Sequence, residues 1–152
     1  IKSDLFNLYF WRLSIVDDKL GKQPMVDKEN EIIVLFNGEI YNYIDLRKQT
    51  SASHHYKTKS DTEVIIGSYK KWGNSCFNYF EGMFSIAIID IKKKKLILSR
   101  DICGVKPLYY ILDENNLKIG SEPKVFFENK NNNKKINVDS LYRYILIPFC
   151  HL

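Results

Sequence analysis

The sequence predicts an α+β fold, in which antiparallel strands are interrupted by helices. The first observation is a pair of β-rich runs, Met83–Asp90 and Leu96–Arg100, joined as a hairpin by a run of lysines. The second is a similar pair, Leu108–Leu112 and Leu117–Ser121, across the polar turn Asp113–Asn116. The third is an amphipathic helical pattern that precedes both hairpins. No regular strand–helix–strand alternation and no internal repeat occurs, so antiparallel sheets are favoured over a parallel one.

The first third of the chain contains two expected strands and one expected helix. Leu5–Val16 is apolar and aromatic, as in a strand that leads into a loop. Glu31–Asn37 is β-rich, and we expect it to end at Asn37–Gly38 in a tight turn or a binding loop. Glycine tolerates positive φ there and lets another group approach the backbone. Tyr43–Gln49 has helical character.

The clearest helix begins after Ser60. Ser60 and Glu63 have the spacing of a capping box, and Gly73 supplies a stop signal. The apolar stripe between them is formed by Val64, Ile65, Tyr69 and Trp72.

The C-terminal part is expected to leave the domain. Asn129–Lys135 is a low-complexity polar stretch, and Val138–Ile147 returns to a helical pattern with Asn137 or Asp139 as its cap. We therefore predict a domain at residues 1–128, a polar linker at 129–136 and the start of another helix at 137–152.

Composition limits the classes of function. The 152 residues are 45% hydrophobic and 27% charged, as in globular proteins, and no apolar run is long enough to cross a bilayer. The net charge of +5 comes mainly from lysines at one expected turn and in the linker, and only four arginines occur. A solvated surface is therefore favoured over a nucleic-acid interface, and we expect neither nucleic acid nor membrane as a partner.

The cysteines argue against a disulfide framework or a zinc site. Cys76, Cys103 and Cys150 are odd in number and have no C-x-x-C spacing. They indicate a reducing compartment and therefore a cytoplasmic protein. Each is expected to be a buried small hydrophobe.

Three short segments carry polar residues inside otherwise apolar surroundings: Arg12–Asp17, Asn37–Asn42 and Ser60–Asp61. Taken singly, an ion-pair arginine, a plain turn and a helix cap are the favoured interpretations. Taken together, an arginine fork suits a carboxylate, a carboxylate at a helix start can receive an ammonium group, and an Asn beside a Gly N–H can form an oxyanion hole. These groups are what a site that hydrolyses the side-chain amide of a free α-amino acid would need.

The order of several motifs resembles the class II glutamine amidotransferase domain of asparagine synthetases. The resemblance extends from about Leu8 to Lys124, and the later INVDSLYRYIL is similar to the start of the helix leading into that family's ATP-using synthetase domain. Relative to the family, the chain is expected to be truncated at both ends. The motifs are RLSIVD, GKQPM, NGEIYNY, KSDTEV, EGMFSIAIID, RDICGVKPLYY and GSEPK.

The resemblance implies an N-terminal nucleophile hydrolase fold, an αββα sandwich of antiparallel sheets that here lacks its first strand. The implied substrate is L-glutamine. The implied roles are the carboxylate clamp for Arg12, the ammonium clamp for Asp61, the oxyanion hole for Asn37 and Gly38, and the pocket lining for Ile15, Val16 and Glu39. The segment containing Arg100, Asp101, Gly104, Lys106 and Pro107 is interpreted as structural or domain-facing.

The resemblance further implies an N-terminal cysteine nucleophile whose α-amino group is the base. This sequence begins at Ile1, so we expect the chain as given to be inactive, and Phe10–Trp11 replaces a polar pair usual in the family. The parent would be a glutamine-hydrolysing asparagine synthetase that amidates aspartate with ATP, and a homodimer is possible for it. No cofactor or metal is expected in this domain, whereas ATP and Mg belong to the parent's second domain. A non-catalytic glutamine-binding or assembly module is the alternative.

Overall fold

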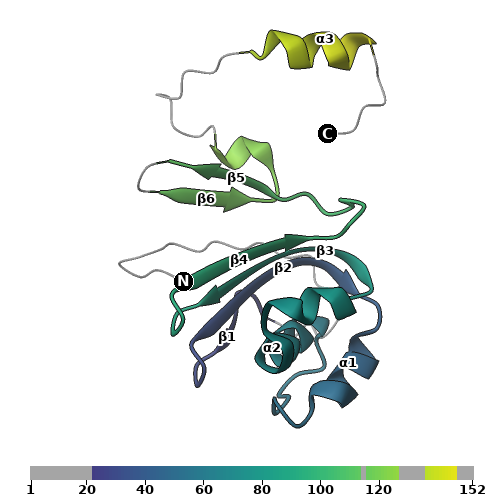
Figure 1. Ribbon diagram of the computed structural model, residues 1–152, viewed down its shortest axis with the longest axis vertical. Helices are drawn as coiled ribbons and strands as arrows, with labels where there is room; N and C mark the ends of the chain where they lie inside the picture. Colours follow the sequence, from purple (N-terminus) through teal and green to yellow (C-terminus); the bar gives the residue numbers. More distant parts are fainter. Residues whose placement is uncertain (1–21, 114–115, 127–135, 147–152) are drawn as a thin grey trace. The chain divides into compact units, whose positions relative to one another are not determined.

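The structure of the protein is a computed structural model that describes residues 22–113, 116–126 and 136–146 (Figure 1). By their internal contacts the residues fall into two units, 1–122 and 123–152, which are considered separately below. The expected α+β class is confirmed, since antiparallel strands and helices follow one another along the chain. The strand predicted at Leu5–Val16 and the linker predicted at 129–136 lie outside the described residues, apart from residue 136.

The first unit contains an antiparallel sheet of four strands in the order β1-β2-β3-β4. The central pair, β2 and β3, is joined over nine residues, from Ile32 opposite Asp90 to Ile40 opposite Gly82. The predicted hairpin across the lysine run is confirmed as β3 and β4. The strands are β1 Met25–Asp27, β2 Ile32–Ile40, β3 Gly82–Asp90 and β4 Lys95–Arg100.

The prediction that the strand ends at Asn37–Gly38 is wrong. β2 continues to Ile40, with Asn37 opposite Ser85 and Gly38 opposite Phe84. A Cβ at Gly38, where φ is +148°, would lie 2.0 Å from the carbonyl oxygen of Met83. The glycine therefore permits a close approach of β3 inside the sheet, a use of glycine that a sequence cannot distinguish from a turn.

Two helices, α1 Tyr43–Thr50 and α2 Asp61–Trp72, lie on one face of this sheet (Figure 1). Their apolar side chains form a single buried cluster with those of β2 and β3. Burial of an Ile or Val side chain contributes roughly 1.5–3 kcal/mol, so this cluster is the main source of stability of the unit. Its fully buried members include Val34, Ile40, Val64, Ile65, Ile86 and Ile88.

The signals at the ends of α2 are confirmed in part. The Ser60 hydroxyl accepts a hydrogen bond from the N–H of Thr62 at 3.2 Å, and Gly73 follows the helix with a φ of +57°. Glu63 does not close the capping box. Its carboxylate instead accepts the N–H groups of Lys57 and Thr58, because the segment before the helix folds back over it.

The two cysteines that the structure describes differ in environment. Cys76 lies in η1, a 3₁₀ helix at Gly73–Tyr79, and is fully buried as predicted. Cys103 is exposed, so the prediction of burial is wrong there, because its loop projects away from the core. Cys150 lies outside the described residues.

The second predicted hairpin is confirmed as β5 Tyr109–Leu112 and β6 Leu117–Gly120. In the second unit, the short 3₁₀ helix η2 covers Pro123–Phe126 and the helix α3 covers Val138–Leu146. The Asn137 side chain caps α3 by accepting the N–H of Ser140 at 3.0 Å, which selects Asn137 over Asp139. Within the described part of the chain, no helix is long and apolar enough to cross a membrane.

Candidate functional site

The structure brings two of the three predicted segments together. Asn37, Gly38 and Glu39 occupy consecutive positions in the last part of β2, and Asp61 is the first residue of α2. The carboxylate oxygen Oδ2 of Asp61 accepts the N–H of Ile40, at 3.3 Å. The helix that carries the predicted ammonium ligand is thus tied to the strand that carries the predicted oxyanion hole. Arg12, Ile15 and Val16 lie outside the described residues.

Asp61 is held in a defined orientation. Its side chain is buried, with 5% of the residue exposed, and its Oδ1 accepts the N–H of Thr62 at 2.8 Å. The carboxylate lies at the N-terminus of α2, where the unpaired amides and the helix dipole favour negative charge. An oriented buried carboxylate of this kind is suited to receiving an ammonium group.

The burial of β2 assigns its residues to two faces. Phe36 and Ile40 are buried in the cluster shared with the helices, whereas Asn37 and Glu39 are only half-buried. Because side chains alternate along a strand, Asn37 and Glu39 belong to the face opposite the helices. The polar side chains of this motif are therefore available at the end of β2 rather than consumed in the core.

Glu63 is a buried charge that the sequence suggested only as part of a capping box. Its carboxylate accepts four hydrogen bonds: from the N–H of Lys57 at 2.8 Å, from the N–H and Oγ1 of Thr58 at 2.7 Å each, and from Nε2 of His54 at 3.1 Å. Burial by itself would raise the pKa of Glu63. The hydrogen bonds from His54, Thr58 and Lys57 outweigh it and lower the pKa to about 2. Glu63 is therefore ionised at neutral pH.

Arg47, on α1, was not identified from the sequence. Its Nη1 donates to the carbonyl oxygen of Thr58 at 2.7 Å, and its Nη2 donates to that of Ser60 at 3.0 Å. The guanidinium also lies 4.1 Å from the ring centroid of Tyr56. No sequence signal distinguishes this arginine from a solvated one on an amphipathic helix, because its partners are backbone carbonyls more than ten residues away.

Asp101 holds the loop that follows β4. The residue is 7% exposed, and its carboxylate accepts the N–H groups of Phe84 at 3.1 Å, Val105 at 2.9 Å and Lys106 at 3.1 Å. Burial would raise the pKa of Asp101, but these amides and that of Gly104 together lower it.

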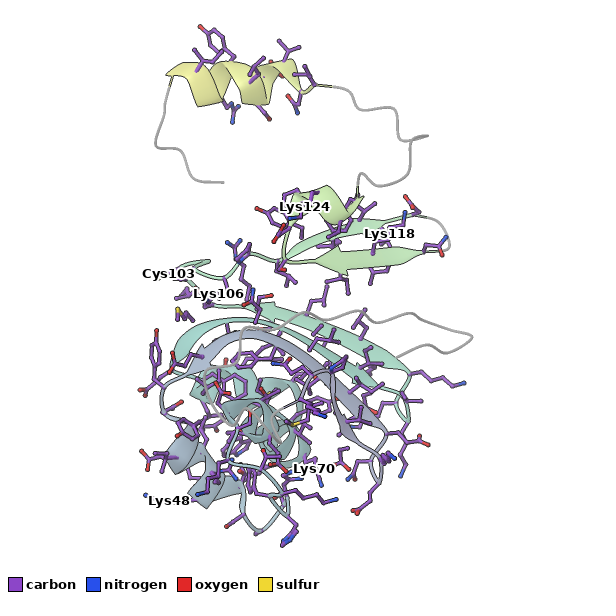
Figure 2. The ribbon with its side chains drawn as sticks, turned by 180° about the vertical axis from the view of Figure 1, so that it is seen from behind. Lys48, Lys70, Cys103, Lys106, Lys118 and Lys124 are labelled. Atoms are coloured by element: carbon purple, nitrogen blue, oxygen red, sulfur yellow. The ribbon has the colours of Figure 1, made fainter. Side chains whose placement is uncertain are left out.

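Arg100 closes the same loop from the other side. It donates to the carbonyl oxygens of Lys106, at 2.8 Å, and of Gly104. Gly104 has a φ of +65°, and a Cβ there would lie 2.6 Å from Nη2 of Arg100. Cys103, labelled in Figure 2, is exposed in this loop, whereas Lys106 is half-buried. These bonds favour the structural interpretation of the segment.

A shallow cleft of about 370 Å³ lies at the other end of the β2–β3 pair, where Ile32 faces Asp90. It is lined by Lys70, Lys92 and Lys93 among others, and Lys70 is labelled in Figure 2. Because Ile32 and Ile40 are the two ends of one strand, this cleft is separate from the predicted site. Among the described residues, no group of three His, Cys, Asp or Glu side chains could hold a metal ion.

Comparison with known proteins gives a consistent result. A family model described as "Glutamine amidotransferase domain" matches residues 2–151. The chain is 42% identical over 128 residues to "Asparagine synthetase [glutamine-hydrolyzing] 2" of Bacillus subtilis, covering 84% of this chain and 17% of that protein. It is 39% identical over 155 residues to a putative asparagine synthetase of Methanocaldococcus jannaschii, covering 91% of this chain and 30% of that protein. The chain thus spans less than a third of the length of these curated relatives.

A solved structure shares the fold. The glutamine phosphoribosylpyrophosphate amidotransferase of B. subtilis, complexed with ADP and GMP, superposes with a TM-score of 0.58 at 21% identity. The match covers 69% of this chain and 25% of that one. At this identity the likeness concerns the fold alone.

Proposed function

The chain belongs to the glutamine amidotransferase domain family, and on that premise we propose that it forms the glutamine site of a longer, asparagine-synthetase-like enzyme. The observation that carries the proposal is the bond from the Ile40 N–H to Asp61, which joins the start of α2 to the strand bearing Asn37–Glu39. A buried carboxylate and a possible oxyanion hole are thereby tied to one strand end.

In the proposed site each charged end of glutamine has a partner. Asp61 receives the α-ammonium group, Arg12 holds the α-carboxylate, and the Asn37 side chain with the Gly38 N–H stabilises the oxyanion that develops on the side-chain amide. Ile15, Val16 and Glu39 line the pocket. The nucleophile would be an N-terminal cysteine of the parent, whose α-amino group takes the thiol proton near neutral pH.

The parent is proposed to hydrolyse glutamine to glutamate and ammonia and to use the ammonia to amidate aspartate. ATP and Mg would act in the parent's second domain, which makes that domain the main partner of this one. The parent would be a cytoplasmic enzyme.

A second candidate is a glutamine-binding module without turnover, and the described cysteines favour it for the chain as given. Burial raises the pKa of the Cys76 thiol to about 12, so a thiolate does not form there at neutral pH. Cys103 lies in the loop after β4, and its side chain is exposed.

Calorimetric titration with L-glutamine tests the proposal. The chain should bind glutamine, and Asp61→Asn or Arg12→Ala should weaken binding by about tenfold or more, since a charge-assisted bond contributes roughly 1.5–3 kcal/mol. Asp45→Asn is the matched control, because the Asp45 side chain is 70% exposed on α1 and pairs with the exposed Lys48. Unchanged binding in both site variants would contradict the proposed roles. Ammonia release by the unmodified chain would separate turnover from binding alone.

A further inference from the structure

The segment at residues 54–60, between α1 and α2, has no regular secondary structure, yet it leads directly to Asp61. Its path is determined by side chains of both helices. Tyr56 packs against α2 at Gly67, where a Cβ would lie 2.2 Å from the tyrosine hydroxyl. The same hydroxyl bonds to Thr50 on α1. The segment is therefore fixed against both helices before it enters α2.

Glu63 fixes the middle of the segment from inside α2. It takes both the N–H and the hydroxyl of Thr58, and the N–H of Lys57. The Thr58 hydroxyl in turn accepts the N–H of Ser60, at 3.1 Å. A chain of hydrogen bonds thus runs from the Glu63 carboxylate through Thr58 to the residue before Asp61.

Arg47 fixes the last part of the segment from α1. Its two terminal nitrogens reach the carbonyl oxygens of Thr58 and Ser60. The Ser60 carbonyl shares a planar peptide unit with the Asp61 N–H, so holding this oxygen sets the direction in which the chain enters Asp61. A guanidinium can make both bonds at once because its donors form a rigid fork.

We infer that Arg47, Thr58 and Glu63 are positioning residues that set the place of the Asp61 carboxylate for the α-ammonium group of the substrate. This inference rests on the proposed function of Asp61. None of the three residues touches glutamine in this arrangement; each acts through the peptide units before Asp61. A displacement of the carboxylate by about 1 Å would take a charge-assisted hydrogen bond of about 2.8 Å beyond hydrogen-bonding distance.

A purely structural role makes a different prediction from a positioning role. If the hydrogen bonds merely stabilise the domain, their loss weakens every ligand of the site to the same extent. If they position Asp61, their loss weakens ligands that carry an α-ammonium group and spares those that do not. The ratio of two affinities therefore distinguishes the two roles.

The test compares L-glutamine with 4-carbamoylbutanoate, which has the same amide and carboxylate but no α-amino group. Both are titrated into the full chain and into Arg47→Lys and Thr58→Val, which are milder than a change at Glu63. Tyr69→Phe is the matched control, because it also removes a buried bond to a carboxylate, that of the Tyr69 hydroxyl to Asp90 at 2.8 Å, but towards the other end of α2. Circular dichroism checks that every variant folds.

In Arg47→Lys and Thr58→Val, glutamine affinity should fall by about tenfold while the affinity for 4-carbamoylbutanoate changes by less than about twofold. Tyr69→Phe should leave the ratio unchanged. If both variants leave the ratio of glutamine affinity to 4-carbamoylbutanoate affinity unchanged, the positioning role is overturned and the proposed function remains intact. If the unmodified chain binds no glutamine, the proposed function fails, and this inference falls with it. If one variant does not fold, the other decides.

Discussion

Two buried aspartates lie beside the central strands, and their surroundings differ. Asp61 accepts an N–H from β2, at Ile40, whereas Asp101 accepts one from β3, at Phe84. The segment before Asp61 is held by side chains from two helices, while the loop after Asp101 is held mainly by Asp101 itself and by the neighbouring Arg100.

The difference lies in where the hydrogen-bond partners of each carboxylate come from. The Asp101 carboxylate accepts backbone amides of Phe84 and of its own loop, at Val105 and Lys106 among others, so its charge serves local folding. Asp61 takes its amides from a helix start and a strand, and the surrounding bonds fix where it lies between them. Burial and charge alone therefore do not make a motif residue a ligand-binding residue. The elements that supply its hydrogen-bond partners must be considered as well.

The largest effect is expected at Gly38, where the two regions meet. Gly38 faces Phe84, whose N–H and C=O both bond to Asp101, and lies two residues before Ile40, which bonds to Asp61. Gly38→Ala would place a Cβ 2.0 Å from a backbone oxygen of β3. We expect a loss of about 3 kcal/mol or more in the free energy of unfolding, measured by urea denaturation, because the central strands must separate.

Gly73→Ala is the control for Gly38→Ala. Gly73 also has a positive φ, +57°, but a Cβ there would meet no heavy atom within 4 Å. Only the cost of a sparsely populated backbone conformation, about 1–3 kcal/mol, should appear, because Gly73 has a ψ of −139°. Equal losses in the two variants would mean that the close strand approach at Gly38 contributes nothing.

The next largest effect on stability is expected at Glu63, whose ionised carboxylate accepts hydrogen bonds from the segment before Asp61. Folding lowers the pKa of Glu63 from 4.5 to about 2. The ionised carboxylate therefore stabilises the fold at pH values above 4.5, and this contribution, roughly 3 kcal/mol, is lost as the pH falls from 4.5 towards 2. Glu63→Gln should be less stable than the unmodified chain at pH 7, and its stability should fall less steeply between pH 5 and pH 2. Parallel pH profiles from urea denaturation would contradict this role for Glu63.

A smaller loss of stability is expected at Asp101, the second aspartate of the comparison. Asp101→Asn keeps one oxygen but turns an amide donor towards backbone N–H groups that need an acceptor. The free energy of unfolding should fall by about 2 kcal/mol. Proteolysis within residues 102–107 should become faster, while the ratio of glutamine to 4-carbamoylbutanoate affinity stays the same. A changed ratio would show that the two regions are not independent.

The smallest effect is expected for Ser60→Ala, which removes the cap of α2. Such changes typically cost about 1 kcal/mol. Here the N–H of Thr62 keeps a second acceptor, Oδ1 of Asp61, at 2.8 Å. The loss should therefore be about 0.5 kcal/mol, at the lower end of the usual range, by urea denaturation. A loss above about 2 kcal/mol would show that Ser60 also supports the segment before it.

Local patterns were sufficient for several elements. The hairpin of β3 and β4, the cap at Ser60 and the stop at Gly73 depend on neighbouring residues, and each was predicted. The environment of Cys103 was not, because hydrophobicity does not show that a loop projects from the surface. The capping box was predicted but not formed, since Glu63 had stronger partners in a segment that folds back.

The sequence by itself determined the α+β class, the order of the elements and the family, because these follow from periodicity and from motif order. Only the tertiary structure decided that Gly38 lies inside a strand, that Asp61 meets Ile40, and that Arg47 and Glu63 hold the segment between α1 and α2. The physical reason is the same in each case. These positions are set by hydrogen bonds and close approaches to residues distant in the chain, and a residue's own type does not specify its partner.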